Sequence, residues 1–306
     1  MVTRSGAIGL SVLFVLVWSS GYLVGSIGIH AGPPLALAAW RFLVSLVVLG
    51  AFTLVTRAPW PSDPHVYVHL MVIGALLQSV QLGAIYLGLG QGVPAGLSSL
   101  ILSASPLLVA ATAVPMFRER LTGRQWIGLT IGLVGVVVSL GGTLTGTARL
   151  TGYAFTALAL ASFAAGTLYQ KRFGQSVDLR TGITIQLLGA ALTSFPLAAL
   201  HGGIGLPLTT PAIGSVLWLA MVNSIGGFTL LFTLLRQRSA SATTSLLYLV
   251  PPVTALLAVP LLHQNLTVGI LLSMGISGVG VVLATRTQAA TTQLPVGAKQ
   301  AESGFR

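Results

Sequence analysis

Two stretches of the chain decide the fold: AGLSSLILSASPLLVAATAVPMFRERLT at residues 95–122 and ASATTSLLYLVPPVTALLAVPLLHQNLT at residues 240–267. Each holds a long apolar run without a charged side chain, has a proline near the middle of that run, and ends on Leu-Thr. A helix needs about 20 apolar residues to cross the hydrocarbon core of a bilayer, and each run is long enough. We therefore expect membrane-spanning helices in two related halves.

The composition of the whole chain supports this reading. Of its 306 residues, 54% are hydrophobic and only 6% are charged. A soluble domain carries about 25% charged residues, so the composition excludes a soluble enzyme, a coiled coil and a disordered protein. The chain has no cysteine, which excludes disulfides, thiolate nucleophiles and thiolate metal sites.

Similar apolar runs recur along the chain, and we expect each to form one helix. They cover residues 7–27, 35–55, 66–89, 94–116, 126–142, 152–169, 180–200, 212–235, 240–262 and 267–285. The runs are too long for strands and lack the alternation of a membrane barrel, and only helices otherwise satisfy the backbone in lipid. The fold class predicted is an all-α integral membrane protein with ten transmembrane helices.

The positive charges predict the topology. With a cytoplasmic N-terminus, all but two of the 15 Lys and Arg residues fall in inner segments, the exceptions being Arg41 and Arg149. This distribution follows the positive-inside rule and places both termini in the cytoplasm. The net charge of +11 is then a topology signal with attraction to anionic lipid, and it needs no nucleic-acid partner.

A shift of 145 residues aligns the two halves without a gap. Identical residues on this register include the pairs Ala95/Ala240, Pro106/Pro251, Ala110/Ala255, Ala113/Ala258, Val114/Val259, Pro115/Pro260, Leu121/Leu266, Thr122/Thr267, Gly21/Gly166 and Gly135/Gly280. Each half holds an odd number of predicted spans, so the halves should have opposite orientations, as in secondary transporters with inverted repeats. We expect one repeat at 1–145, a second, inverted repeat at 146–285, and a disordered cytoplasmic tail at 286–306.

Several motifs add a family resemblance that covers about residues 1–285. The stretches GLSSLILSASPLL at 96–108, FRERLTGRQWIGL at 117–129 and GVVVSLGG at 135–142, with WSS at 18–20 and WRF at 40–42, resemble the EamA domain of the drug/metabolite transporter superfamily. One departure is Gln264, which stands where the first repeat has Glu119. The resemblance implies two inverted five-helix repeats and a central cavity lined by spans 1, 3, 4, 6, 8 and 9. Members of the family move amino acids, other metabolites or drugs, commonly outward.

Polar and aromatic residues on these spans are the candidates for substrate binding. They are Trp18, Ser19, Tyr22, Gln78, Gln81, Ser99, Ser103, Phe163, Asn223, Phe228, Thr244 and Tyr248. The alternative for each polar group is a hydrogen bond between helices, and for each ring ordinary packing. Gln78 and Asn223 are singled out because they are central and occupy the same position in the two repeats.

Three further residues have two readings each. Arg41 is the only charged side chain in the interior of a predicted span, close enough to its outer end to reach the interface. It either anchors the structure or caps carbonyl groups, or it serves as a gate or anion contact. Pro106 and Pro251 interrupt spans four and nine, and act either as hinges or as static bends.

These observations predict a secondary transporter of the inner (plasma) membrane that exports amino acids or similar metabolites by alternating access. The absence of Asp and Glu from the spans favours facilitated transport, and the alternative is a proton-coupled carrier of drugs, nucleosides or lipid-like solutes. No enzyme motif, filter loop or Walker A pattern is present, and no cofactor or metal is expected. The expected partners are a small-molecule substrate and the bilayer. Glycine-rich faces in spans five and ten suit either a homodimer contact or packing within one chain.

Overall fold

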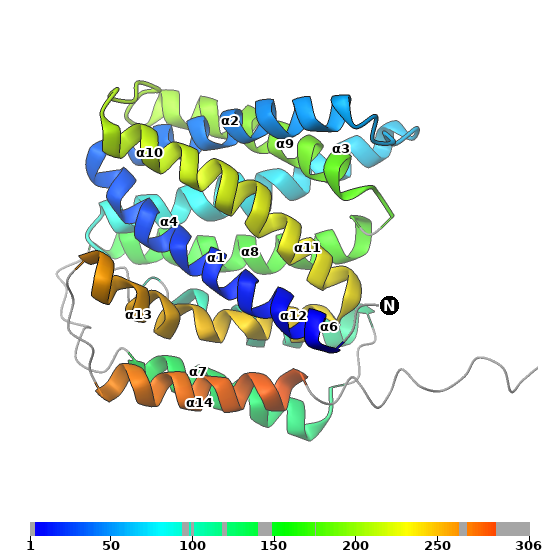
Figure 1. Ribbon diagram of the computed structural model, residues 1–306, viewed down its shortest axis with the longest axis vertical. Coiled ribbons are helices and arrows are strands. Elements are labelled where there is room, and N and C mark those ends of the chain that lie inside the picture. The colour runs from blue at the N-terminus through cyan, green and yellow to red at the C-terminus, as the bar shows by residue number, and fades with distance from the viewer. Residues whose placement is uncertain are drawn as a thin grey trace, which may run out of the picture.

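The chain folds into a bundle of helices, shown in Figure 1. The computed structural model describes residues 4–93, 98, 101–117, 121–139, 149–174, 176–262 and 268–285, and every regular element in these ranges is helical. The first half comprises α1 (Arg4–Ala31), α2 (Pro34–Val55), α3 (Pro64–Gly74), η1 (Ala75–Val80), α4 (Gln81–Gly90), α6 (Ser105–Phe117) and α7 (Gly123–Ser139). The second half comprises α8 (Leu150–Phe173), α9 (Leu179–Leu200), α10 (Thr210–Trp218), η2 (Leu219–Gly227), α11 (Phe228–Gln237), α12 (Ala240–Thr244), η3 (Ser245–Leu249), α13 (Val250–Leu262) and α14 (Val268–Thr285). Two predictions, Ser99 as a site residue and the tail at 286–306, lie outside the described residues.

Six helices in the described part are long and apolar enough to cross a membrane: Ile8–Ala31, Pro34–Val55, Pro64–Gly90, Leu150–Phe173, Leu179–Leu200 and Thr210–Gln237. Shorter apolar helices, among them Ser105–Phe117 and Gly275–Ala284, lie beside them. The all-helical membrane fold is therefore confirmed, while the count of ten spans stays a prediction.

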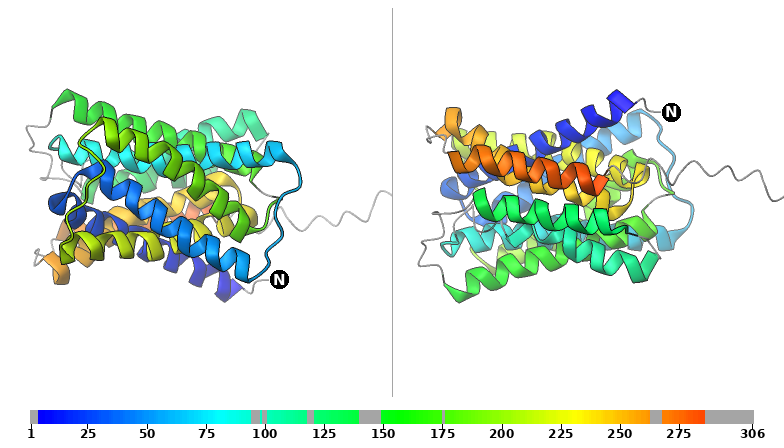
Figure 2. Two further views of the ribbon diagram at one scale, coloured as in Figure 1. Left: turned by 90° about the horizontal axis from the view of Figure 1, so that it is seen from above. Right: turned by 90° about the horizontal axis from the view of Figure 1, so that it is seen from below.

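The helices pack as related pairs at the two ends of the bundle. In Figure 1, α2 and α9 lie together at the top and α7 and α14 at the bottom, and the two further views show each pair side by side (Figure 2). Each pair joins helices at equivalent positions of the 145-residue register. The colours in Figure 1 show that the partners in each pair run in opposite directions. Opposite direction is what an inverted repeat requires.

Between these ends, helices of one half pack against helices of the other half. Helix α1 packs against α10, η2 and α13, and its equivalent, α8, packs against α3, η1, α4 and α6. The central helices thus bring residues from both halves of the chain to the middle of the bundle.

Two of the long helices contain a π-helical segment at the same place in the register. The segment η1 covers Ala75–Val80, and η2 covers Leu219–Gly227. A π segment inserts an extra residue into a helical turn and is frequent at functional sites. The sequence analysis did not predict these segments.

The fourth and ninth runs are interrupted, and the interruption precedes each proline. A turn at Ser103 and Ala104 leads into α6, and the 3₁₀ segment η3 leads into α13. Pro106 and Pro251 then stand at the second residue of α6 and α13. Proline fits the first turn of a helix because the amide groups there have no partner within the helix. The predicted break is present, but each proline starts a helix rather than bending one in its middle.

Glycines on α7 and α14 let the two backbones approach closely. A Cβ atom added to Gly280 would stand 2.6 Å from the Cα of Gly132 and 2.7 Å from the carbonyl oxygen of Gly128. For one added to Gly278, the described residues place no heavy atom within 4 Å beyond the backbone of its own helix. Contact within one chain thus accounts for Gly128, Gly132 and Gly280, and the homodimer contact stays a prediction.

We expect Gly280→Ala to lower the free energy of unfolding by about 1–3 kcal/mol, because the methyl group must push two backbones apart. Gly278→Ala is the matched control on the same helix, and it should be neutral or slightly stabilising because alanine favours helices. Thermal unfolding of both variants in detergent checks this. Equal midpoints for the two variants would contradict the packing argument.

Candidate functional site

Two small cavities adjoin each other in the middle of the bundle, and both halves of the chain contribute to their walls. The larger has a volume of about 40 Å³ and is lined by Trp18, Gly21, Tyr22, Arg41, Gln81, Leu82, Ile85, Asn223 and Phe228. The smaller, of about 10 Å³, is lined by Trp18, Tyr22, Gln81, Leu102, Ser103, Ser105, Phe163, Leu247, Val250 and Pro251. These volumes hold one to a few waters, so an organic solute needs the walls to move apart.

Trp18 stands at the junction of the two cavities and anchors an aromatic wall. Its ring centroid lies 5.1 Å from that of Phe14, 5.4 Å from that of Phe228 and 6.1 Å from that of Phe163, the last two in edge-to-face geometry. Phe163 is the repeat equivalent of Trp18. Such a wall offers an apolar surface with defined shape to a solute side chain.

Arg41 is buried in the wall of the larger cavity, with only 2% of its surface exposed. Its Nε and Nη2 donate to the hydroxyl oxygen of Ser224 at 3.1 and 3.0 Å, and its Nη1 donates to the Tyr86 hydroxyl at 2.9 Å. These contacts lie inside the bundle and fit the structural-anchoring reading, while the role as a gate or anion contact stays a prediction. A guanidinium has five N–H donors, so these contacts use three and leave two.

No carboxylate pairs with Arg41 within the described part of the chain. Asp63 accepts the amide of His65 at the start of α3, and Asp178 forms an ion pair with Arg180 at the start of α9. A buried cation is costly unless an opposite charge lies close to it. The cavity beside Arg41 is thus a place where an anionic group would be stabilised.

Two amide side chains in the same wall have acceptor oxygens without a partner. Gln81 is 1% exposed and Asn223 7% exposed, and neither Oε1 of Gln81 nor Oδ1 of Asn223 has a hydrogen-bond partner in the described part. The Asn223 amide group is held in place because its Nδ2 donates to the carbonyl oxygen of Val17 at 2.6 Å. The cavity thus presents a cation on one helix and unpaired acceptors on two others.

The structure gathers most of the predicted site residues around these cavities, but four described ones lie elsewhere. Ser19 donates to the carbonyl oxygen of Val250, and Thr244 donates to that of Ala240 in its own helix. Tyr248 is fully buried and packs on Gly132. Gln78 is also fully buried and belongs to neither cavity wall.

Other residues of the site were not chosen as candidates for substrate binding. Tyr86 and Ser224, which hold Arg41, are polar residues of the predicted spans three and eight, but no local pattern places them beside Arg41. Ser105 lines the smaller cavity, and its position directly before Pro106 in the broken span is a signal that could have identified it. The apolar lining residues Leu82, Ile85 and Leu102 look like any other residue of a membrane helix.

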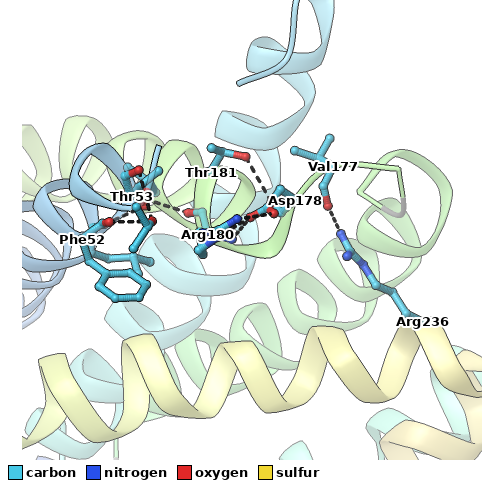
Figure 3. Close-up of polar contacts among 10 residues, drawn as sticks. Phe52, Thr53, Val177, Asp178, Arg180, Thr181 and Arg236 are labelled. Carbon is cyan, nitrogen blue, oxygen red and sulfur yellow. Dashed lines mark hydrogen bonds and ion pairs between the residues drawn. The ribbon is translucent and has the colours of Figure 1, made fainter. Parts of the chain in front are cut away.

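A second polar cluster ties α2, α9 and α11 together near one end of the bundle (Figure 3). Arg236 donates to the carbonyl oxygens of Gly174 and Val177, and Thr53 on α2 contacts Thr184 on α9 at 3.0 Å between their hydroxyl oxygens. The Arg180 guanidinium donates to Asp178 and holds the pKa of that carboxyl below its usual range. Asp178 therefore stays ionised at neutral pH, and its contacts with Arg180 hold the start of α9.

Comparisons with known proteins agree with this architecture. The model of the EamA-like transporter family matches residues 5–141 and 150–286, one match in each half. A solved structure superposes with a TM-score of 0.76 at 23% identity, covering 95% of this chain and all of the other, which supports the fold.

Named relatives are similar over most of their lengths. The chain is 30% identical over 272 residues to the "Probable amino-acid metabolite efflux pump" of Escherichia coli K12, covering 84% of this chain and 87% of that protein. It is 29% identical to the "Uncharacterized inner membrane transporter YedA" of the same organism, covering 88% and 87%, and 28% identical to the "Probable terminal-alkyne amino-acid exporter" of Streptantibioticus cattleyicolor, covering 83% and 84%. The family and these relatives are transporters, and the two matches in one chain confirm the resemblance drawn from the motifs. This multi-pass membrane protein therefore belongs to the EamA-like transporter family of the drug/metabolite transporter superfamily.

Proposed function

We propose that this protein exports amino acids or closely similar zwitterionic metabolites across the inner membrane, with both termini in the cytoplasm. The observation that carries the proposal is the buried guanidinium of Arg41, which has no described carboxylate partner and borders a cavity with unpaired amide oxygens. Arg41 would bind the substrate carboxylate, and the oxygens of Gln81 and Asn223 would accept from the ammonium group. The names of two relatives, an amino-acid metabolite efflux pump and an amino-acid exporter, point the same way.

The mechanism we propose is alternating access between the two repeats. The site lies between the halves, repeat-equivalent helices run in opposite directions, and the cavities are too small for an amino acid in the state described. The walls must therefore part to admit substrate. The interrupted helices ahead of Pro106 and Pro251 give two equivalent places for that movement.

Counterflow in proteoliposomes tests the function. Vesicles are loaded with single unlabelled amino acids, and a trace of the same labelled amino acid is added outside, with and without a pH gradient. We expect transient accumulation for some amino acids and none for their amides or N-acetyl derivatives, which lack one of the two charges. Absence of counterflow for every amino acid would overturn the substrate assignment.

A proton-coupled carrier is the second candidate, and one contact favours it. Nδ1 of the partly buried His69 lies 2.7 Å from the Tyr169 hydroxyl, and its ring stacks on Phe173 with the centroids 4.2 Å apart. Histidines within membrane spans take part in the proton relays of pumps and transporters, and His69 joins α3 to α8 through this contact. Accumulation that follows the pH gradient and is lost in His69→Gln would favour this candidate over facilitated transport.

A further inference from the structure

The register of the repeats pairs Gln78 in η1 with Asn223 in η2, but the two amides differ in their burial and their hydrogen bonds. Asn223 lines the larger cavity and donates to α1. Gln78 is 0% exposed, lies in neither cavity wall, and neither its Nε2 nor its Oε1 has a hydrogen-bond partner in the described residues. A buried amide without partners is unfavourable, so this arrangement requires an explanation.

The helices that face the two amides show how the halves differ. Asn223 lies over Gly21 on α1, so that a Cβ atom on Gly21 would stand 2.6 Å from Nδ2 of Asn223. Gly166 on α8 is the repeat equivalent of Gly21, but the side chain above it is Leu77, whose Cγ would stand 2.6 Å from an added Cβ. In the first repeat the helix is therefore offset by one residue, and Leu77 occupies the place that the register assigns to Gln78.

The hydrogen bonds between these helices also differ between the two repeats. In the second repeat, Asn223 donates to the carbonyl oxygen of Val17. In the first repeat, Ser162, the equivalent of Val17, donates its hydroxyl to the carbonyl oxygen of Leu76 at 2.8 Å. A shift by one residue turns a helix by about 100°. The π segment already contains one extra residue, and that residue is the one that such a shift must move.

We propose that Gln78 and Asn223 exchange these roles when the protein opens to the opposite side of the membrane. In that state η1 turns by one residue, Gln78 takes its place over Gly166 and donates to the carbonyl oxygen of Ser162, and its amide enters the cavity wall. At the same time η2 turns so that Asn223 leaves Gly21 and becomes buried. The substrate ammonium group then meets the Gln78 oxygen in one state and the Asn223 oxygen in the other. This inference rests on the proposed alternating-access function.

Cysteine labelling tests the exchange, and the chain suits it because it contains no cysteine of its own. Gln78→Cys and Asn223→Cys are each reconstituted, and an impermeant methanethiosulfonate is placed either outside or inside the vesicles. We expect each thiol to react faster from one side, and the favoured side to be opposite for the two variants. The difference in rate should be at least about 10-fold, because a state that exposes the thiol to the other side would be a minor state populated at about 0.1–10%. Gln81→Cys, in the wall of both cavities, should react from both sides, and the core variant Ile73→Cys from neither.

A pair of substitutions separates the exchange from a merely structural role. Gln78→Leu removes a buried amide without partners, so it should raise the thermal midpoint by about 2–4 °C and yet lower amino-acid counterflow. Gln78→Asn, which copies the second repeat, should retain counterflow. A protein in which Gln78→Cys is unreactive from both sides and Gln78→Leu transports normally would overturn the inference. Opposite-sided labelling without counterflow of any amino acid would instead leave the exchange standing and overturn the proposed substrate.

Discussion

Arg41→Gln is expected to reduce amino-acid counterflow about 30-fold or more, because removing one partner of a buried charge pair costs about 2–5 kcal/mol. The loss should be confined to transport. In the state described, the guanidinium donates to the hydroxyls of Ser224 and Tyr86 and lies 5.3 Å from the centroid of the Phe42 ring. Its removal takes a buried cation out of the bundle and leaves two hydroxyls for the glutamine amide to contact. The thermal midpoint should therefore stay the same or rise, while a structural anchor would lower it.

Arg41→Lys distinguishes geometry from charge. A lysine keeps the positive charge but lacks the planar guanidinium. That group donates to both Ser224 and Tyr86 and still has N–H donors left for a carboxylate. We expect it to restore only a small part of the transport lost in Arg41→Gln. Arg57→Gln is the control, because Arg57 is exposed after the end of α2. Wild-type counterflow in Arg41→Gln would show that the carboxylate binds elsewhere.

The sequence alone was sufficient for the all-helical membrane fold and the family because the two strongest signals act over whole segments. Apolar runs depend on the bilayer and the 145-residue register depends on the ancestry of the halves, so neither requires knowledge of tertiary contacts. The position of Arg41 within its span followed directly. Its burial did not, since its partners Ser224 and Tyr86 are 183 and 45 residues away in sequence.

The π segments show why other details of the site could not be predicted. Residues 75–80, ALLQSV, continue the apolar pattern of α3 and α4 without any local signal for an extra residue. Close packing accompanies the irregularity: Gly74 lies directly against the backbone of Gln186, and Gly189 against that of Met71. Gln78 was expected at the cavity because its chemistry and register match those of Asn223, and only the contacts of Leu77 and Leu76 show that the first repeat is offset.

Gln81→Glu is expected to reverse the charge preference of the carrier. Gln81 and Arg41 line the same cavity, and the Gln81 oxygen has no described partner, so a carboxylate of the same shape at this position would pair with the guanidinium across the cavity. The internal pair would occupy the site that the substrate carboxylate needs. Counterflow of zwitterionic amino acids should fall about 30-fold or more, as for loss of a buried charge contact worth about 2 kcal/mol or more.

The same variant should gain an activity that the parent lacks. With Arg41 neutralised internally, a primary amine without a carboxylate would bring its ammonium group to the new acidic side chain, so amines should compete for the site in Gln81→Glu and not in the parent protein. This gain should fade as the pH falls, because protonation of the glutamate removes the attraction. Gln91→Glu, at the end of α4 and outside both cavities, is the matched control and should leave selectivity unchanged. Loss of zwitterion transport together with a lower thermal midpoint and no gain for amines would mean that Gln81 only supports the packing of α4, and the assignment of its oxygen to the substrate ammonium group would be wrong.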